Sequence, residues 1–267
     1  MVTTQTSSSS SSTPTHVLVT GAAGAIGAAI ARAMRAAWPA CQLALLDRDA
    51  GPGGALAALA AELGNATTHG VDLTKLDELP DLIASLAPLD GLVNCAGIMR
   101  VQQVQSWKWD DAQELMAVDL LAPLRLQDLV ARGMVERGHG VIVNIASMAG
   151  KVPLKGCAYY GASKAGLAMA SEIARADLAP HGIRVVTVYP GPVRSALEQG
   201  ARDAYGGGGV LGKLAPSGDP AELATRIMKA LEHDEPRVIY PRLYGVGWSA
   251  TNLSSWIALS YGPPPLS

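Results

Sequence analysis

The stretch VLVTGAAGAIGAAIARAM, residues 17–34, decides the fold. An apolar run ends at Thr20, glycines follow at Gly21, Gly24 and Gly27, and a helix-length segment comes next. A glycine turn between a strand and a helix gathers backbone N–H groups where a pyrophosphate can bind. In a chain this rich in alanine and glycine, the turn can also be purely structural. The strands that follow must therefore show whether it belongs to a dinucleotide-binding fold.

Short apolar runs alternate with helix-length segments along the rest of the chain. Because the runs are continuous rather than alternating, they predict strands that are buried on both faces. The pattern predicts an α/β fold, a doubly wound parallel sheet of six to seven strands with helices on both faces. The predicted strands are residues 16–20, 42–47, 68–73, 90–97, 140–147 and 182–191, with 237–241 as a seventh.

No repeat or linker divides the chain, so we expect one domain over residues 16–267. The serine-rich residues 1–15 predict a disordered tail, since they cannot bury enough surface to become ordered. Residues 191–218 contain the run YGGGGVLGKLAPSG and predict a mobile loop beside the substrate. The next helix is well marked, with Asp219 as its N-cap and Pro220 in its first turn.

Composition narrows the class of partner. The 267 residues carry a net charge of −2 and are 49% hydrophobic, which favours a small-molecule partner over nucleic acid or an anionic membrane. Cys41, Cys95 and Cys157 are widely spaced, so neither a disulfide framework nor a metal site is expected. With no secretory signal and no segment long enough to span a membrane, we expect a cytoplasmic protein.

Acidic residues at the ends of two predicted strands could contact the adenosine part of a bound dinucleotide. Asp47 ends the second strand, where a carboxylate can accept hydrogen bonds from an adenosine ribose and repel a 2′-phosphate. NAD is therefore favoured, although Arg48 could attract that phosphate and NADP stays open. Asp72 could reach the adenine or merely cap a helix.

Five motifs in order carry a family likeness. They are TGAAGAIG at 20–27, NCAG at 94–97, NIAS at 144–147, Y-x-x-x-K at 160–164 and PGPVRS at 190–195. Over residues 16 to about 240 the chain resembles the short-chain dehydrogenase/reductase family. This resemblance implies a Rossmann-like fold, NAD(P)(H), and hydride transfer between an alcohol and a carbonyl carbon. It also implies a homodimer or homotetramer formed through the helices around residues 110–137 and 160–179.

The resemblance also assigns roles to residues. It implies Ser147, Tyr160 and Lys164 as the catalytic group, with Asp119 where the family usually has asparagine. The cofactor-binding residues indicated by the motifs and strand ends are Gly21, Gly24, Ala25, Ile26, Gly27, Asp47, Arg48, Asp72, Leu73, Asn94, Ala96, Gly97, Tyr160, Lys164, Pro190, Gly191, Val193 and Ser195. The expected substrate contacts are Ser147, Met148, Cys157, Tyr159 and Tyr160.

The chemistry explains why these residue types suit the reaction. A tyrosine is too weak a base at neutral pH, and lowering its pKa by about three units takes about 4 kcal/mol. One ammonium about 4 Å away, at an effective dielectric constant of about 20, supplies about that much. Tyr160 and Lys164 are four residues apart and share a helix face, whereas Tyr159 is rotated by about 100°. Ser147 would hold the substrate oxygen.

Asp119 leaves the proton relay open to two interpretations. Pro123 has no N–H, so the carbonyl of residue 119 loses its helical partner and could hold the relay water implied by the family. We hypothesise that the relay survives in this way. Alternatively, Pro123 only kinks the helix and Asp119 is solvated.

Three rival functions match parts of the sequence. GASKA at 161–165 nearly matches a hydrolase nucleophile elbow, with Asp203 and His233 downstream, but no strand precedes Ser163. A non-catalytic dinucleotide-binding sensor or scaffold and an NADPH-dependent carbonyl reductase remain as alternatives. The sequence does not indicate which alcohol or ketone is the substrate.

Overall fold

The structure, a computed structural model, describes residues 13–206 and 217–262. Seven strands form one sheet in the order β3-β2-β1-β4-β5-β6-β7, and every neighbouring pair is parallel. They are β1 His16–Thr20, β2 Gln42–Asp47, β3 Ala66–Gly70, β4 Gly91–Asn94, β5 Gly140–Ile145, β6 Ile183–Pro190 and β7 Arg237–Tyr240. The predicted doubly wound parallel sheet is confirmed, and the seventh strand joins it at the edge beside β6.

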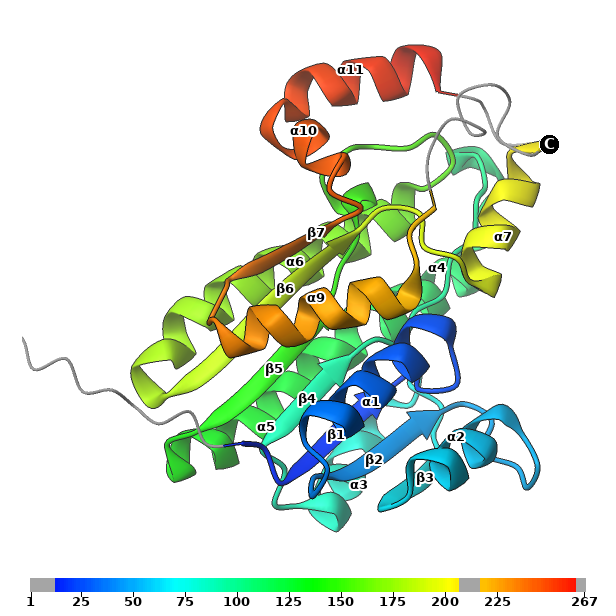
Figure 1. The fold of residues 1–267 in the computed structure, drawn as a ribbon. Coiled ribbons are helices and arrows are strands. Elements are labelled where there is room, and N and C mark those ends of the chain that lie inside the picture. Colours follow the sequence, from blue (N-terminus) through cyan, green and yellow to red (C-terminus); the bar gives the residue numbers. More distant parts are fainter. Residues whose placement is uncertain (1–12, 207–216, 263–267) are drawn as a thin grey trace, which may run out of the picture.

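Helices cover both faces of this sheet (Figure 1). They are α1 Ala25–Ala37, α2 Ala55–Leu63, α3 Leu79–Leu86, α4 Trp109–Met116, α5 Ala122–Arg137, α6 Ala158–Leu178, α7 Ala196–Ala204, α9 Pro220–Glu232, α10 Tyr244–Ser249 and α11 Thr251–Tyr261. The helices α1 and α9 lie on the front face in Figure 1, with α5 and α6 behind. This is a three-layer Rossmann-like architecture.

The alternation of side chains along each strand builds a core on each side of the sheet. Val17 and Val19 of β1 pack with Ile30 of α1, whereas Leu18 between them packs with Leu126 of α5. Because both faces are covered, each strand needs apolar residues at successive positions. This explains why the predicted runs were continuous.

The third strand differs from its prediction. It spans Ala66–Gly70 rather than 68–73, so Asp72 and Leu73 lie in the loop that follows. As an edge strand with only β2 as a neighbour, β3 does not need two apolar faces, and its residues are all at least partly exposed. The apolar pattern therefore misplaced it.

Two segments predicted to be unstructured or mobile contain ordered residues. Residues 1–12 of the predicted tail lie outside the described residues, but Thr15 is held by Asp90, which accepts hydrogen bonds of 2.9–3.0 Å from its N–H and hydroxyl. The predicted loop 191–218 contains helix α7, whose N-cap Ser195 accepts a hydrogen bond from the N–H of Glu198. Residues 207–216 lie outside the described residues, so the mobility of the loop stays a prediction.

The predicted start of α9 is confirmed. Asp219 Oδ1 accepts hydrogen bonds of 2.7 and 3.2 Å from the N–H groups of Ala221 and Glu222, and Pro220 occupies the first turn. The cap fixes where the chain re-enters the sheet layers after the loop.

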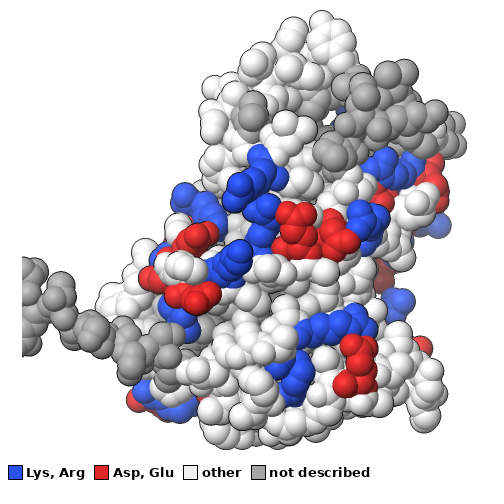
Figure 2. Space-filling view, viewed as in Figure 1, with Lys and Arg blue, Asp and Glu red and all other residues white. Residues whose placement is uncertain are grey.

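The described residues can be compared with the predictions about membrane spans, metal sites, disulfides and surface charge. Over residues 13–206 and 217–262, no helix is long and apolar enough to cross a membrane, and no three acidic, histidine or cysteine side chains gather as a metal site would require. The three cysteines are unpaired. Figure 2 shows basic and acidic side chains mixed over the viewed face.

Candidate active site

The glycine turn lies at the carboxyl end of β1, where the strand order reverses between β1 and β4. Gly21 has φ +65°, and a Cβ there would lie 2.7 Å from the Cα of Ala96 in the loop after β4. A Cβ on Gly27 would lie 2.1 Å from the Gly21 carbonyl oxygen. Both glycines are therefore required by close backbone approach, and the turn lies at the switch point where dinucleotides bind in such sheets.

The N-terminus of α1 at this turn fits an anionic group. Gly24 is its N-cap, no side chain caps the helix, and its first turn holds no acidic residue. The first N–H groups of a helix need partners, and a pyrophosphate provides them. The residues at the predicted cradle thus fit a dinucleotide.

Asp47 is close to the same turn. Its carboxylate accepts hydrogen bonds of 3.0 Å from the N–H of Ala23 and 2.8 Å from the N–H of Arg48. The structure therefore brings the predicted ribose-binding carboxylate to the glycine turn and fixes it there.

Asp72 is engaged in a local turn. It accepts hydrogen bonds from the N–H and hydroxyl of Thr74 at 3.0 and 2.7 Å, and these bonds hold the pKa of Asp72 below its ordinary value. Asp72 does not cap a helix, because the short helix Leu76–Glu78 that follows has Lys75 at its N-cap and no side-chain cap. The contact with adenine stays a prediction. Arg48, Asp72 and Thr74 line one side of a cavity of about 610 Å³ whose other wall is α4. Leu73 is buried in the core beneath.

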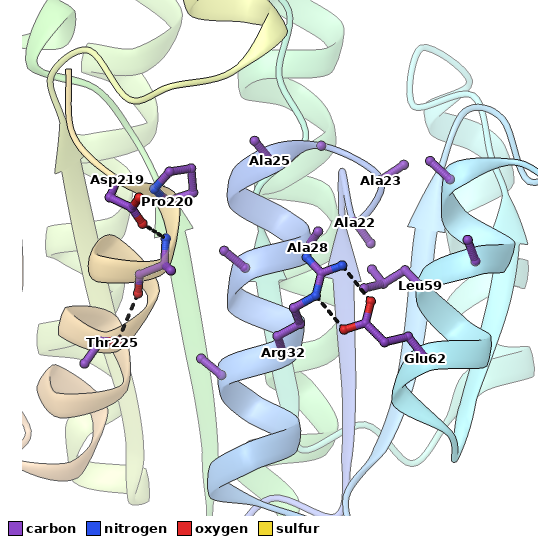
Figure 3. Close-up of a pocket in the computed structure, with 16 residues that line it drawn as sticks. Ala22, Ala23, Ala25, Ala28, Arg32, Leu59, Glu62, Asp219, Pro220 and Thr225 are labelled. Atoms are coloured by element: carbon purple, nitrogen blue, oxygen red, sulfur yellow. Dashed lines mark hydrogen bonds and ion pairs between the residues drawn. The ribbon is translucent and has the colours of Figure 1, made fainter.

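A larger cavity, of about 810 Å³, runs along α1 between α2 and α9 (Figure 3). Ala23 and Gly24 of the glycine turn lie at one end, and the Arg32–Glu62 ion pair lies farther along α1. None of the predicted catalytic residues lines this cavity. This cavity therefore includes part of the predicted dinucleotide cradle and lies apart from the predicted catalytic residues.

Asn94 of the NCAG motif is turned into the protein. The register pairs it with Asn144 on β5, and Asn94 Nδ2 donates to Asn144 Oδ1 at 2.8 Å and to the Pro123 carbonyl at 3.2 Å. Thr20 Oγ1 accepts hydrogen bonds from the N–H groups of Cys95 and Ala96. Asn94 thus fixes the end of β4 through internal contacts, and its cofactor role stays a prediction.

The predicted catalytic group comes together where β5 and α6 meet. Ser147 follows β5, Tyr160 lies in the first turn of α6, and Lys164 lies one turn farther; their exposed fractions are 7%, 8% and 4%. Ser147 Oγ accepts a hydrogen bond from the N–H of Ala149, and Lys164 Nζ donates to the Ile145 carbonyl at 3.2 Å. Ser147 is therefore held by its own loop, and Lys164 is held against the end of β5.

The electrostatic balance at Tyr160 differs from the prediction. Burial raises the pKa of Tyr160 above its ordinary value; Lys164 lowers it, Asp119 raises it further, and a hydrogen bond with Ser147 lowers it. The expectation that Lys164 alone nearly suffices to lower this pKa is wrong, because burial and Asp119 outweigh the ammonium.

Asp119 lies in a π-helical turn, η3 (Ala117–Leu121), between α4 and α5. Its Oδ1 accepts a hydrogen bond of 2.7 Å from the N–H of Ile98, and its Oδ2 lies 3.4 Å from Lys164 Nζ. The side chain is fully buried, so the alternative of a solvated Asp119 is wrong. The hypothesis that the carbonyl of residue 119 holds a relay water stays a prediction.

Four of the five predicted substrate residues, all except Ser147, divide between two apolar clusters. Cys157, Tyr159 and Tyr160 pack with Leu115, and the Tyr159 ring makes an edge-to-face contact with Trp107 at 4.8 Å. Met148 packs instead with Ala146, Ala168 and Tyr189. The wall beside Tyr160 is therefore aromatic on the Tyr159 side, and Trp107 is a residue that sequence reasoning missed.

The PGPVRS segment lies beyond the end of β6. A Cβ on Gly191 would lie 3.0 Å from the ring of Tyr244, Val193 forms a bridge with Gly218, and the Ser195 hydroxyl caps α7. These contacts give Val193 and Ser195 roles in fixing the loop. Tyr244, the first residue of α10, lies against Gly191 and is a residue that sequence reasoning missed.

Comparisons with known proteins agree with this geometry. Residues 15–206 match the family model described as short chain dehydrogenase. The chain is 32% identical to the ketoacyl reductase HetN of Nostoc sp. over 84% of this chain and 77% of that protein. It is 34% identical to the D-threitol dehydrogenase of Mycolicibacterium smegmatis over 75% of this chain and 78% of that protein.

A solved structure shows the same fold. The short-chain dehydrogenase from Sphingobium yanoikuyae in complex with NADPH superposes with a TM-score of 0.75 at 28% identity, covering 92% of this chain and 96% of that one. The chain belongs to the short-chain dehydrogenase family of oxidoreductases, which bind NAD(P) and act on alcohol or ketone substrates.

Proposed function

We propose that the protein is an NAD-dependent oxidoreductase that transfers a hydride between a secondary alcohol or ketone and nicotinamide, with Tyr160 as the general acid and base. The convergence of Ser147, Tyr160 and Lys164 at the carboxyl end of β5 supports this proposal. The glycine turn at the same edge of the sheet supports a bound dinucleotide.

Each residue then has a distinct task. Gly21 to Gly27 and the N-terminus of α1 would hold the pyrophosphate, and Asp47 would bind the adenosine ribose. Bound nicotinamide supplies or accepts the hydride. The Ser147 hydroxyl orients the substrate oxygen, and Tyr160 exchanges a proton with that oxygen. Lys164, between Tyr160 and the Ile145 carbonyl, stabilises the tyrosinate.

A substrate panel tests this function. Purified protein is mixed with secondary alcohols and oxidised cofactor, or with ketones and reduced cofactor, and the absorbance of reduced nicotinamide is followed. We expect turnover with at least one apolar or cyclic pair. Tight dinucleotide binding with no turnover over a broad panel would favour the non-catalytic sensor instead.

Cofactor choice is the first specific prediction. The Asp47 carboxylate repels a 2′-phosphate, so Asp47→Ser is expected to raise the affinity for NADPH relative to NADH by about tenfold or more. A serine hydroxyl can still accept the hydrogen bond from Ala23, so the turn should persist. Dissociation constants for both cofactors, measured by nucleotide fluorescence, give the ratio.

The matched control is Asp49→Ser. Asp49 is exposed and accepts a hydrogen bond from the N–H of Gly51, so this variant removes the same charge two residues away. We expect a clearly smaller change in the ratio. If neither variant alters the ratio, Asp47 does not set the cofactor preference. The proposed NAD preference itself fails if the parent protein binds NADPH as tightly as NADH.

We also propose that the protein is a homodimer or homotetramer through α4, α5 and α6. Trp109, Leu121, Met169 and Ile173, on or beside these helices, are 65%, 46%, 64% and 53% exposed. Large apolar side chains left in water on neighbouring helices favour association. Sedimentation equilibrium would reject the proposal by giving the mass of one chain.

A further inference from the structure

Asp119 gives Lys164 a buried counter-ion. Its Oδ2 lies 3.4 Å from Lys164 Nζ, and the two side chains are 0% and 6% exposed. Oδ1 is occupied by the N–H of Ile98, whereas Oδ2 has no hydrogen-bond partner in the described part of the chain. The ammonium of Lys164 is thus the one cation close to this oxygen among the described residues.

The fold fixes this pair and leaves little room beside it. The π-helical turn places an i→i+5 hydrogen bond between the Ala122 N–H and the Ala117 carbonyl, which sets the direction of Asp119. A Cβ added to Gly97 would lie 3.2 Å from Lys164 Nζ and 3.5 Å from Asp119 Oδ1. Because the backbone at Gly97 packs directly against both charges, the pair is shielded from solvent.

Two charged groups shift the pKa of the Tyr160 phenol, in opposite directions. Lys164 comes from α6 and Asp119 from η3; the other groups that act on the phenol are Ser147 and the thiol of Cys157. Cys95, after β4, also acts on Lys164. Burial raises the pKa of the Cys95 thiol to about 12 and also raises that of Cys157, so both stay neutral at neutral pH.

The ion pair with Asp119 also affects the pKa of Lys164 and the effect of its ammonium on Tyr160. Burial alone would lower the pKa of Lys164, but the Asp119 carboxylate and the Tyr160 phenol more than offset it, so the ammonium persists. Burial raises the pKa of Asp119 above its ordinary value, while Lys164 and the hydrogen bond from the Ile98 N–H lower it. When the carboxylate is ionised, it opposes the field of the ammonium at the phenol. A neutral asparagine at this position would leave that field unopposed.

We propose that Asp119 is a positioning residue that pairs with Lys164 and thereby weakens the pull of the ammonium on the Tyr160 phenol, which adapts the site to carbonyl reduction. This inference rests on the proposed function. In the reductive step, the carbonyl carbon accepts a hydride from reduced nicotinamide and the π electron pair moves to oxygen. That oxygen then takes the Tyr160 proton, and the tyrosinate beside Lys164 recovers a proton from solvent.

Direct titration of Tyr160 tests the inference without substrate or cofactor. The ultraviolet absorbance of tyrosinate is followed against pH, and the curve of a Tyr160→Phe variant is subtracted to isolate this ring. The same difference is measured in an Asp119→Asn background. We expect the midpoint to fall by about one pH unit or more, since removing a buried charge changes proton affinity at least tenfold.

Controls keep the titration interpretable. Asp128→Asn removes a carboxylate from an exposed ion pair with Arg132 and should leave the Tyr160 midpoint unchanged. Asparagine keeps an acceptor for the Ile98 N–H, and Asp119→Ser serves as a second uncharged variant if the first unfolds. An unchanged midpoint in the folded variant would overturn the inference, because the carboxylate would then be neutral or too weakly coupled to Tyr160.

Kinetics provide an independent readout. For the oxidation, kcat/KM should rise with pH, and for the reduction it should fall, with a shared midpoint. Asp119→Asn should move both curves to lower pH by the amount seen in the titration. A lower rate at every pH with an unmoved midpoint would indicate a merely structural role. Absence of turnover in every variant would reject the proposed function, while the titration would still decide the inference.

Discussion

Replacing Tyr160 with phenylalanine is expected to lower kcat by about 10²–10⁴-fold, the usual contribution of a positioned general acid or base. The ring packs with Leu115 and Cys157, and phenylalanine can keep these contacts. The loss should therefore be confined to the hydroxyl and its proton. Steady-state kinetics with a substrate from the panel measure kcat, and a separate titration should show nearly unchanged dinucleotide affinity.

Tyr159→Phe is the matched control, because it removes the same hydroxyl from the adjacent residue. The Tyr159 ring lies 4.8 Å from that of Trp107 and 6.4 Å from that of Trp109, both edge to face. These contacts involve the ring, so kcat should stay within about threefold of the parent. Retained activity in Tyr160→Phe, or equal losses in both variants, would rule out Tyr160 as the specific acid and base.

The sheet was predictable because a strand that is buried on both faces needs apolar residues at successive positions. Strands β1, β2, β5 and β6 lie under helices on each side, so each appears as an unbroken apolar run. The pattern failed at β3, whose edge position relaxes that demand. It also missed α7, since a short helix of mixed polarity after Ser195 lies in a segment dominated by its glycines.

The closeness of Tyr160 and Lys164, the proposed catalytic pair, was predictable for a different reason. Tyr160 and Lys164 are neighbours on one helix, so their spacing alone places them on one face. The Asp119–Lys164 contact joins segments far apart in the sequence and depends on a π-helical turn, for which no composition signal exists. The available signal was the aspartate itself, where the family usually has asparagine; the direction of its side chain required the structure.

Replacing Lys164 with methionine is expected to reduce the free energy of unfolding by about 3–5 kcal/mol, the usual cost of breaking a buried ion pair by removing one partner. Methionine fills a similar volume, but Asp119 Oδ2 loses the ammonium 3.4 Å away and no solvent replaces it. Urea unfolding of the parent and the variant measures the difference. In the Asp119→Asn background the same replacement should cost clearly less, because no charge is left unpaired.

The pH dependence of this loss identifies the group responsible. In Lys164→Met, burial holds the pKa of Asp119 above its value in the unfolded chain, so the folded state is favoured while the carboxyl is protonated. The deficit should therefore be small in acid and grow as the pH rises from the unfolded-state pKa through the folded-state pKa. A deficit that is independent of pH, and equal whether the background is the parent chain or Asp119→Asn, would mean that the carboxyl is neutral beside Lys164. In that case the ammonium would act on Tyr160 unopposed, as in a site that has asparagine at this position.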